Sequence, residues 1–161
     1  MAGVMSAIVC VATLLIRIPL SATDGYFNIG DAMVFTGALI FGPTVGGFGG
    51  CVGSALADMI SGSGGHAPIT LVVKGIEGTL AGLISNGKDW KRDVLAVVVG
   101  GAGMISVYFL AEAFVIGYGV LLALAKVSFN FIQVLAGGIV SVPLSLIARR
   151  YLILLTTVEE R

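Results

Sequence analysis

Four charged side chains, Lys74, Glu77, Glu112 and Lys126, lie inside stretches that are otherwise apolar. An ionisable group within a membrane-spanning helix costs at least ~2.5 kcal/mol, so it tends to persist where it faces a bundle interior or a cavity and serves a function. Two cations and two anions balance, which suits a small neutral or zwitterionic ligand better than a bare ion. The four residues therefore predict an internal polar binding site.

A purely structural alternative exists for these charges. Lys74 and Glu77 are three residues apart, so they share a helix face and could simply satisfy each other. Under this alternative, Glu112 and Lys126 would also have to form a purely structural ion pair, by coincidence at a similar depth in the membrane. We therefore prefer the binding-site interpretation.

The composition places these residues in a membrane protein. The chain has 161 residues, of which 57% are hydrophobic and 11% charged, and its mean hydropathy is +1.06. Soluble domains carry about 25% charged residues. A helix that crosses the bilayer needs about 20 apolar residues, so residues 1–161 predict a single all-α transmembrane domain of six helices. The net charge of zero gives no reason to expect nucleic acid as a partner.

Breaks in the apolar pattern set the expected helices. The second helix is too short to span upright, so we expect a short or re-entrant helix that turns at Gly42-Pro43 into the third. The segment 17–29 has the polar composition of a structured loop that could cover a site. The six predicted helices are 1–16, 30–41, 43–60, 67–86, 94–117 and 119–148.

The basic residues set the expected orientation. The connection 86–92 and the tail from Arg149-Arg150 hold most of the basic charge outside the helices. The positive-inside rule makes that side cytoplasmic, so both termini should be cytoplasmic. At 1.5 Å per residue, the buried polar side chains then lie about 8 to 21 Å below the outer surface. We expect the binding pocket in the outer half of the bilayer.

Other candidate chemistry is weaker. The segment 82–89 nearly matches a phosphate-binding loop, but Asp89 replaces the required hydroxyl and the segment ends a membrane helix. His66 is the only histidine and lies in a glycine-rich turn, as either a solvated residue or a ligand contact. Asp31 and Asp58 are interpreted as helix-end or loop-anchoring carboxylates. No Ser/His arrangement is available inside the bilayer. We predict no enzyme activity, cofactor or metal site.

Small residues recur every four positions in two of the predicted helices. In the third helix the rows formed by Gly42, Gly46 and Gly50, and by Gly49, Gly53 and Ala57, indicate close packing within the chain. In the first helix such rows could pack within the chain or against another membrane subunit. The residues of those rows are Ala2, Gly3, Ser6, Ala7 and Cys10.

Several motifs together resemble a known family, the substrate-binding S component of energy-coupling factor (ECF) vitamin transporters, in its riboflavin, hydroxymethylpyrimidine or pyridoxine branch. The resemblance is most specific over residues 17–84. The motifs that carry it are Arg17-Ile-Pro-Leu, Gly25-Tyr-Phe-Asn-Ile-Gly-Asp-Ala32, Phe41-Gly-Pro43, Gly53-Ser-Ala-Leu-Ala-Asp58, Ala67-Pro68 and Lys74-Gly-Ile-Glu-Gly78.

The resemblance implies a multi-pass protein of the prokaryotic plasma membrane that binds a vitamin from outside. It also implies a transmembrane T component and two ATP-binding-cassette ATPases as partners, with the small-residue rows of the first helix as the docking face for the T component. Pyridoxine or hydroxymethylpyrimidine is slightly favoured as the ligand, and riboflavin comes next. The alternative is a stand-alone secondary carrier or an oligomeric channel.

The expected substrate contacts combine the resemblance with the buried polar residues. The first loop should act as a lid through Asn28, and Tyr108, Phe109 and Phe129 should pack against a heteroaromatic ring. The polar contacts should come from Lys74, Glu77, Glu112, Lys126, Asn130 and Gln133.

Overall fold

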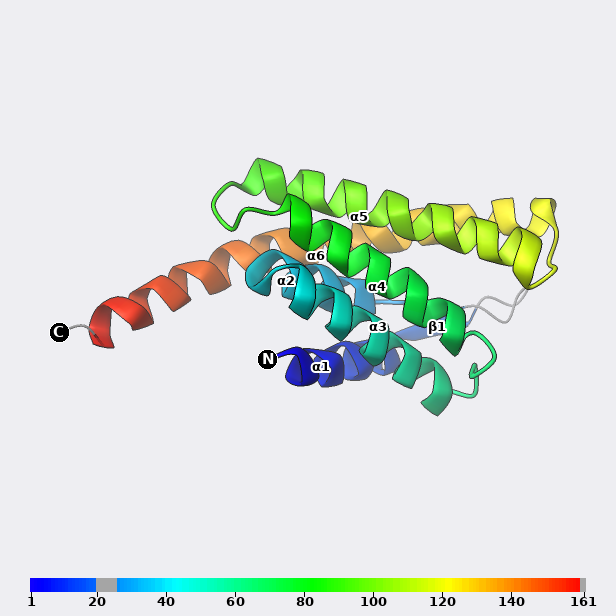
Figure 1. Ribbon diagram of the computed structural model, residues 1–161, viewed down its shortest axis with the longest axis horizontal. Coiled ribbons are helices and arrows are strands. Elements are labelled where there is room, and N and C mark those ends of the chain that lie inside the picture. Colours follow the sequence, from blue (N-terminus) through cyan, green and yellow to red (C-terminus); the bar gives the residue numbers. More distant parts are fainter. Residues whose placement is uncertain (20–25, 160–161) are drawn as a thin grey trace.

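The computed structural model describes the backbone of residues 1–19 and 26–159 and the side chains of residues 1–18 and 26–151. Part of the predicted loop, residues 20–25, lies outside the described residues. The elements are helices connected by short turns, with one small antiparallel hairpin after the first helix (Figure 1). Their bounds are α1 Ala2–Leu15, β1 Arg17–Pro19, β2 Tyr26–Asn28, α2 Gly30–Phe41, α3 Pro43–Ile60, α4 Ala67–Ile84, α5 Trp90–Leu110, the π-helical segment η1 Ala111–Val115, and α6 Val120–Glu159.

The predicted helix limits hold for α2 and α3 and differ for the others. Helix α4 ends two residues early because Ser85 is extended, and α5 begins four residues early because the Asp89 side chain accepts a hydrogen bond from the Lys91 N–H and caps the helix. The predicted end of the fifth helix becomes the π-helical segment η1. Helix α6 continues beyond residue 148 to Glu159, because the basic pair Arg149-Arg150 does not end it and contains no helix breaker.

Within the part of the chain that the structure describes, three helical segments are long and apolar enough to cross a membrane. They are Ala67–Ile84, Trp90–Val115 and Val120–Tyr151. Helices α1 and α2 are apolar but shorter. Six transmembrane passages therefore remain a prediction, while an all-α membrane protein agrees with these helices.

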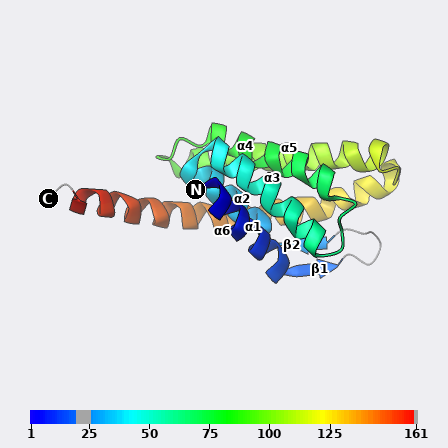
Figure 2. The same ribbon diagram turned by 60° about the horizontal axis from the view of Figure 1, so that its bottom comes forward.

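The helices lie roughly side by side and define two ends of the molecule. The hairpin and the α3–α4 and α5–α6 turns lie together at one end, here called the hairpin end (Figures 1 and 2). The start of α1, the α4–α5 loop and the end of α6 lie toward the other, here called the termini end. Helix α6 projects beyond the other helices at the termini end.

Helix α2 forms the centre of the packing. Nine of its twelve residues are buried, and it contacts α1, α3, α4, α5 and α6. Phe35 is fully buried and packs with Val73 of α4 and Met104 of α5 in the main apolar cluster. The turn into α3 is tight because Gly42 adopts φ +83°, a conformation that favours glycine, and Pro43 then starts α3. A short central helix is thus enclosed by longer ones.

The small-residue rows of α3 pack within the chain, as predicted. A Cβ atom added to Gly53 would lie 2.5 Å from the carbonyl oxygen of Ser6 in α1, and one added to Gly46 would lie 2.5 Å from the Cα of Ala38 in α2. Real Cβ atoms essentially never come that close, so glycine is what lets these backbones approach.

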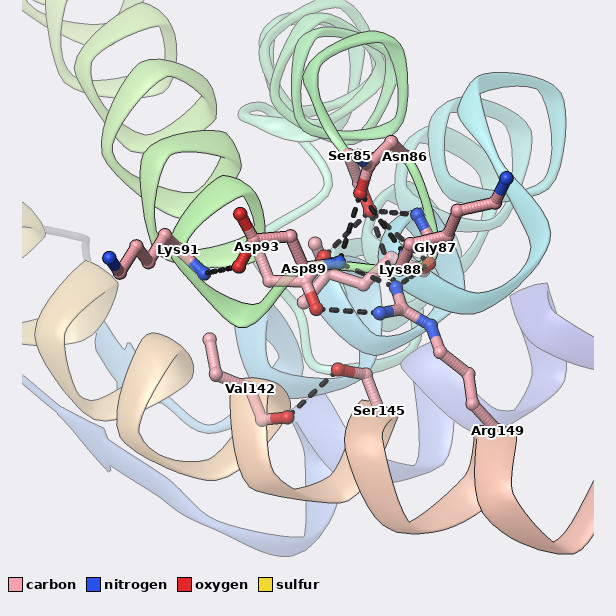
Figure 3. Close-up of polar contacts among 11 residues, drawn as sticks. Ser85, Asn86, Gly87, Lys88, Asp89, Lys91, Asp93, Val142, Ser145 and Arg149 are labelled. Carbon is pink, nitrogen blue, oxygen red and sulfur yellow. Dashed lines mark hydrogen bonds and ion pairs between the residues drawn. The ribbon is translucent and has the colours of Figure 1, made fainter.

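A buried ionic cluster joins four helices at the termini end (Figure 3). The Arg149 guanidinium donates to both carboxylate oxygens of Asp93, at 2.7 and 3.2 Å, and to the Leu39 carbonyl. The Ser85 hydroxyl also donates to Asp93, at 2.7 Å. We call Leu39, Ser85, Asp93 and Arg149 the Arg149 cluster. The prediction that Arg149 belongs to a tail outside the helices is wrong, because Arg149 lies within α6 and pairs with the fully buried Asp93.

Candidate ligand-binding site

A cavity of about 70 Å³ lies at the hairpin end between α1, β2, α3, α4, α5, η1 and α6. Its lining mixes charged, polar and aromatic side chains, in contrast to the apolar surroundings of the helices. Seven of the eight substrate-contact residues predicted from the sequence line it. The lining residues are Thr13, Tyr26, Phe27, Asn28, Ser54, Asp58, Ser63, His66, Thr70, Lys74, Tyr108, Glu112, Lys126, Phe129, Asn130 and Gln133.

Lys74 lies on one side of the cavity and is held by two carboxylates. Its Nζ atom forms ion pairs with Asp31 of α2 and with Glu77 one turn along α4, the latter at 2.9 Å. Gln133 of α6 donates to the second oxygen of Asp31 at 2.9 Å. All four side chains are buried. The arrangement fixes the ammonium group at the cavity wall.

Two sequence interpretations of this group need correction. Asp31 was interpreted as a helix-end carboxylate, but it is a buried partner of Lys74. The charge of Asp31 in an apolar helix could have indicated a buried ion pair. Its position in the first turn of α2 favoured the interpretation as a helix-end carboxylate instead. Glu77 was expected to touch the ligand, but it is fully buried and is not among the residues that line the cavity. It supports Lys74 from behind.

A second ion pair, between Glu112 and Lys126, lines another part of the cavity. Glu112 belongs to the π-helical segment η1, a local irregularity that often occurs at functional sites. The Lys126 ammonium also lies 5.1 Å from the centre of the Tyr118 ring. Both charged side chains are buried, at 3% and 6% exposed. The spacing of η1 and α6 therefore brings together two charges that are 14 positions apart in the sequence.

Strand β2 of the hairpin lines the cavity, and hydrogen bonds join the hairpin to neighbouring elements. Asn28 lines the cavity, and its backbone N–H donates to the Gln133 side chain at 3.2 Å. The Arg17 guanidinium stacks 4.0 Å from the centre of the Tyr26 ring and donates to Ser63 at 2.7 Å. The predicted position of Asn28 in a covering loop therefore agrees with the geometry.

Tyr26 connects the hairpin to α3. Its hydroxyl donates to the Asp58 carboxylate. Burial, together with the hydrogen bond and charge of Asp58, raises the pKa of Tyr26 above its usual value, so the hydroxyl remains a donor across the physiological range. Asp58 thus anchors a loop, as predicted, and lines the cavity as well.

The aromatic residues are distributed differently from the prediction. Tyr108 and Phe129 line the cavity, whereas Phe109 is not among the lining residues. The Tyr108 hydroxyl donates to Thr70 at 3.2 Å. His66 also lines the cavity, and its Nε2 atom lies 3.1 Å from the Tyr118 hydroxyl. A ligand contact by His66 stays a prediction.

A family comparison agrees with this arrangement. The model of the family described as "ECF-type riboflavin transporter, S component" matches residues 1–150. The chain belongs to this family. It is therefore a substrate-binding S component of an ECF transporter, a membrane protein of vitamin uptake and a transport subunit rather than an enzyme.

A curated relative covers nearly the same length. The S component is 43% identical over 143 residues to a Pyrococcus woesei protein described as "Uncharacterized protein in gap 3'region". The match spans 88% of this chain and 95% of that protein.

The expected docking residues on α1 of this S component fall into two groups. Ser6 and Cys10 are buried within the chain, and the Ser6 backbone meets α3 at Gly53, so these two side chains are not available to a partner. Gly3 and Ala7 are exposed, and a Cβ atom on Gly3 would meet nothing within 4 Å. Ala2 is half-buried. Of the two interpretations of these rows, internal packing applies to Ser6 and Cys10.

Proposed function

We propose that this S component binds a compact, water-soluble heteroaromatic vitamin or precursor in the cavity beneath the hairpin. The observation that carries the proposal is the convergence of Lys74, the Glu112–Lys126 ion pair and four aromatic side chains, Tyr26, Phe27, Tyr108 and Phe129, on one cavity in an otherwise apolar helical protein. Binding pockets for small molecules combine an apolar lining with a few fixed polar groups.

The proposed roles follow from the lining. Tyr108 and Phe129 pack against the ring of the vitamin, while Asn130 and Gln133 supply neutral hydrogen-bonding groups. Lys74 and the Glu112–Lys126 pair provide fixed charges at the ring edges. Glu77 contributes by holding Lys74 in place. The hairpin limits exchange with water.

The proposed orientation places the hairpin end outside the cell. The exposed Lys88, Lys91, Arg92 and Arg150 lie on the α4–α5 loop, the start of α5 and α6, at the termini end, and the positive-inside rule makes this end cytoplasmic. The vitamin then enters from outside. Its release would require a transmembrane T component and two ATPase subunits, which supply the energy of ATP hydrolysis.

The choice of vitamin rests on the charges around the cavity. The matched family is described by riboflavin. We keep pyridoxine or hydroxymethylpyrimidine ahead of riboflavin, because the chain is short and its four buried charges leave limited apolar room for a larger ring system.

Two measurements test the function. Mass spectrometry of small molecules that copurify with the full chain should find one of these compounds, and calorimetric titration of the ligand-free protein should then give saturable binding. Failure of all three vitamins to bind the folded protein would contradict the proposal.

A further inference from the structure

Two carboxylates of the cavity each have one oxygen without a partner. Asp58 accepts from Tyr26 through Oδ1, and Glu112 pairs with Lys126 through Oε1. Among the described residues, no donor reaches Asp58 Oδ2 or Glu112 Oε2. Both side chains are 3% exposed and line the cavity. A buried acceptor without a donor carries its full desolvation penalty, so both oxygens can accept from a ligand.

Both lysines that line the cavity are already paired with carboxylates. Lys74 is bound by Asp31 and Glu77, and Lys126 is bound by Glu112. Arg17 is not among the residues that line the cavity. It donates to the Ser61 carbonyl and the Ser63 hydroxyl and stacks on the Tyr26 ring, while its Nε atom has no acceptor among the described residues.

The groups of the cavity that lack a partner are acceptors. They are Asp58 Oδ2 and Glu112 Oε2, both on buried carboxylates that line the cavity. A carboxylate or phosphate placed in the cavity would bring further acceptor oxygens against them, where neither side supplies a donor. The anion would be desolvated without that compensation, which is costly.

We propose that the cavity selects ligands that are neutral or cationic and that present two N–H or O–H donors, one to Asp58 and one to Glu112. The two acceptors come from α3 and η1, so the donors belong on separate edges of the ligand. This inference rests on the proposed function and adds the charge class of the substrate. Carboxylated and phosphorylated forms of the same ring are excluded.

The test compares ligands that differ mainly in charge. Pyridoxine is paired with 4-pyridoxic acid, in which one hydroxymethyl group is a carboxylate, and riboflavin is paired with its 5′-phosphate. One of the two pairs should bind in a calorimetric titration of the purified full chain at neutral pH. Within that pair, the uncharged compound should bind at least tenfold more tightly than the acidic compound. Equal or tighter binding of the acidic member would overturn the inference and leave the proposed function standing. Binding of no compound would instead contradict the proposed function, and the inference with it.

Variants that each remove one charge identify the residues responsible for the preference for the uncharged ligand. Glu112→Gln keeps a hydrogen-bond acceptor but leaves the Lys126 ammonium group without its counter-charge. The neutral ligand should therefore bind at least fivefold more weakly. The ratio of the Kd of the acidic ligand to that of the neutral ligand should fall, or drop below one. Asp58→Asn should weaken the neutral ligand without freeing a cation. Asp89→Asn removes a charge from the exposed α4–α5 loop and is the matched control. A folded Glu112→Gln protein with an unchanged preference would overturn the role of Glu112.

Discussion

Lys74 lines the cavity, and both of its carboxylate partners lie behind it, away from the lining. Among the described residues, replacement of Glu77 by Gln leaves Asp31 as the remaining carboxylate partner of the Lys74 ammonium group. We expect vitamin binding to weaken by more than ~1.5 kcal/mol, because a buried charged group loses a partner and shifts in position. Calorimetric titration of Glu77→Gln measures the effect. Unchanged affinity would show that Asp31 alone positions Lys74.

Lys126 has a different role, because its partner Glu112 also lines the cavity. Lys126→Met leaves a buried carboxylate without its cation, so we expect vitamin affinity to fall by more than ~1.5 kcal/mol and the thermal unfolding temperature to fall as well. Titration and thermal unfolding in detergent test the two effects separately. If Lys126→Met kept both its vitamin affinity and its unfolding temperature, the Glu112–Lys126 pair would not be part of the binding site.

Charge in an apolar stretch was an effective signal at the scale of residues. It identified Lys74, Glu112 and Lys126, because burial of an ion is costly wherever it occurs along a helix. This signal could not distinguish a residue that contacts the ligand from a residue that positions such a contact. Glu77 was therefore predicted to contact the ligand, whereas it positions Lys74. Asp31 was missed because a carboxylate in a first helical turn has an adequate local explanation.

The contact of α1 with α3 offers a test at the scale of elements. Gly53→Leu would force a side chain against the Ser6 backbone, so we expect a large loss of folded protein, whereas Gly3→Leu meets open space and should leave thermal stability unchanged. Thermal unfolding of the two variants in detergent gives the comparison. Equal stability would contradict the close α1–α3 packing.

The exposed row of α1 tests the proposed docking face. Ala7→Leu enlarges a side chain at the surface beside Gly3, so vitamin binding by the isolated chain should persist while copurification with a T component falls. Vitamin titration and affinity copurification are the measurements. Undiminished copurification of the variant would place the T component elsewhere.

The Arg149 cluster ties α2, the end of α4, α5 and α6 together. Arg149→Met would strand the fully buried Asp93 carboxylate, and we expect a destabilisation of about 3 to 5 kcal/mol with little direct effect on the distant cavity. Thermal unfolding of Arg149→Met and of the double variant Arg149→Met/Asp93→Asn tests this. The double variant should recover part of the loss, and a double variant as unstable as the single one would contradict the ion-pair explanation.

Helix ends were predicted where local chemistry marks them. Gly42 and Pro43 fixed the boundary between α2 and α3, since few other residues suit that turn. The predicted start of α5 was four residues too late. Its first turn contains Lys91, Arg92 and Asp93, and these charged residues were interpreted as part of the preceding loop. Asp93 is in fact half of a buried pair whose other half, Arg149, is 56 positions away. Single-sequence patterns do not reveal such distant pairings.

The orientation of the whole molecule can be tested with single cysteines in a background without Cys10 and Cys51. Gly64→Cys lies on the exposed α3–α4 turn and Lys88→Cys on the exposed α4–α5 loop. In intact cells, a membrane-impermeant maleimide should label position 64 and leave position 88 unlabelled until the membrane is opened. The reverse pattern would invert the proposed topology.

Reconstitution tests whether the chain acts alone. If the proposed function holds, the purified protein in liposomes should bind vitamin without accumulating it, because the proposal assigns the energy of uptake to partner ATPases. Filter assays with radiolabelled vitamin measure both properties. Uptake by the chain alone would favour a stand-alone carrier.

The enclosed position of α2 also affects how the protein responds to lipids. A helix of 12 residues rises only about 18 Å, far less than the ~30 Å hydrocarbon layer. Because its neighbours surround it, hydrophobic mismatch with lipid does not act on it directly, and changes in bilayer thickness act on the longer helices, such as α5 and α6. These two helices also carry Tyr108, Lys126 and Phe129 of the cavity lining. Acyl-chain length should therefore alter vitamin affinity through the outer helices, while the central helix keeps its place.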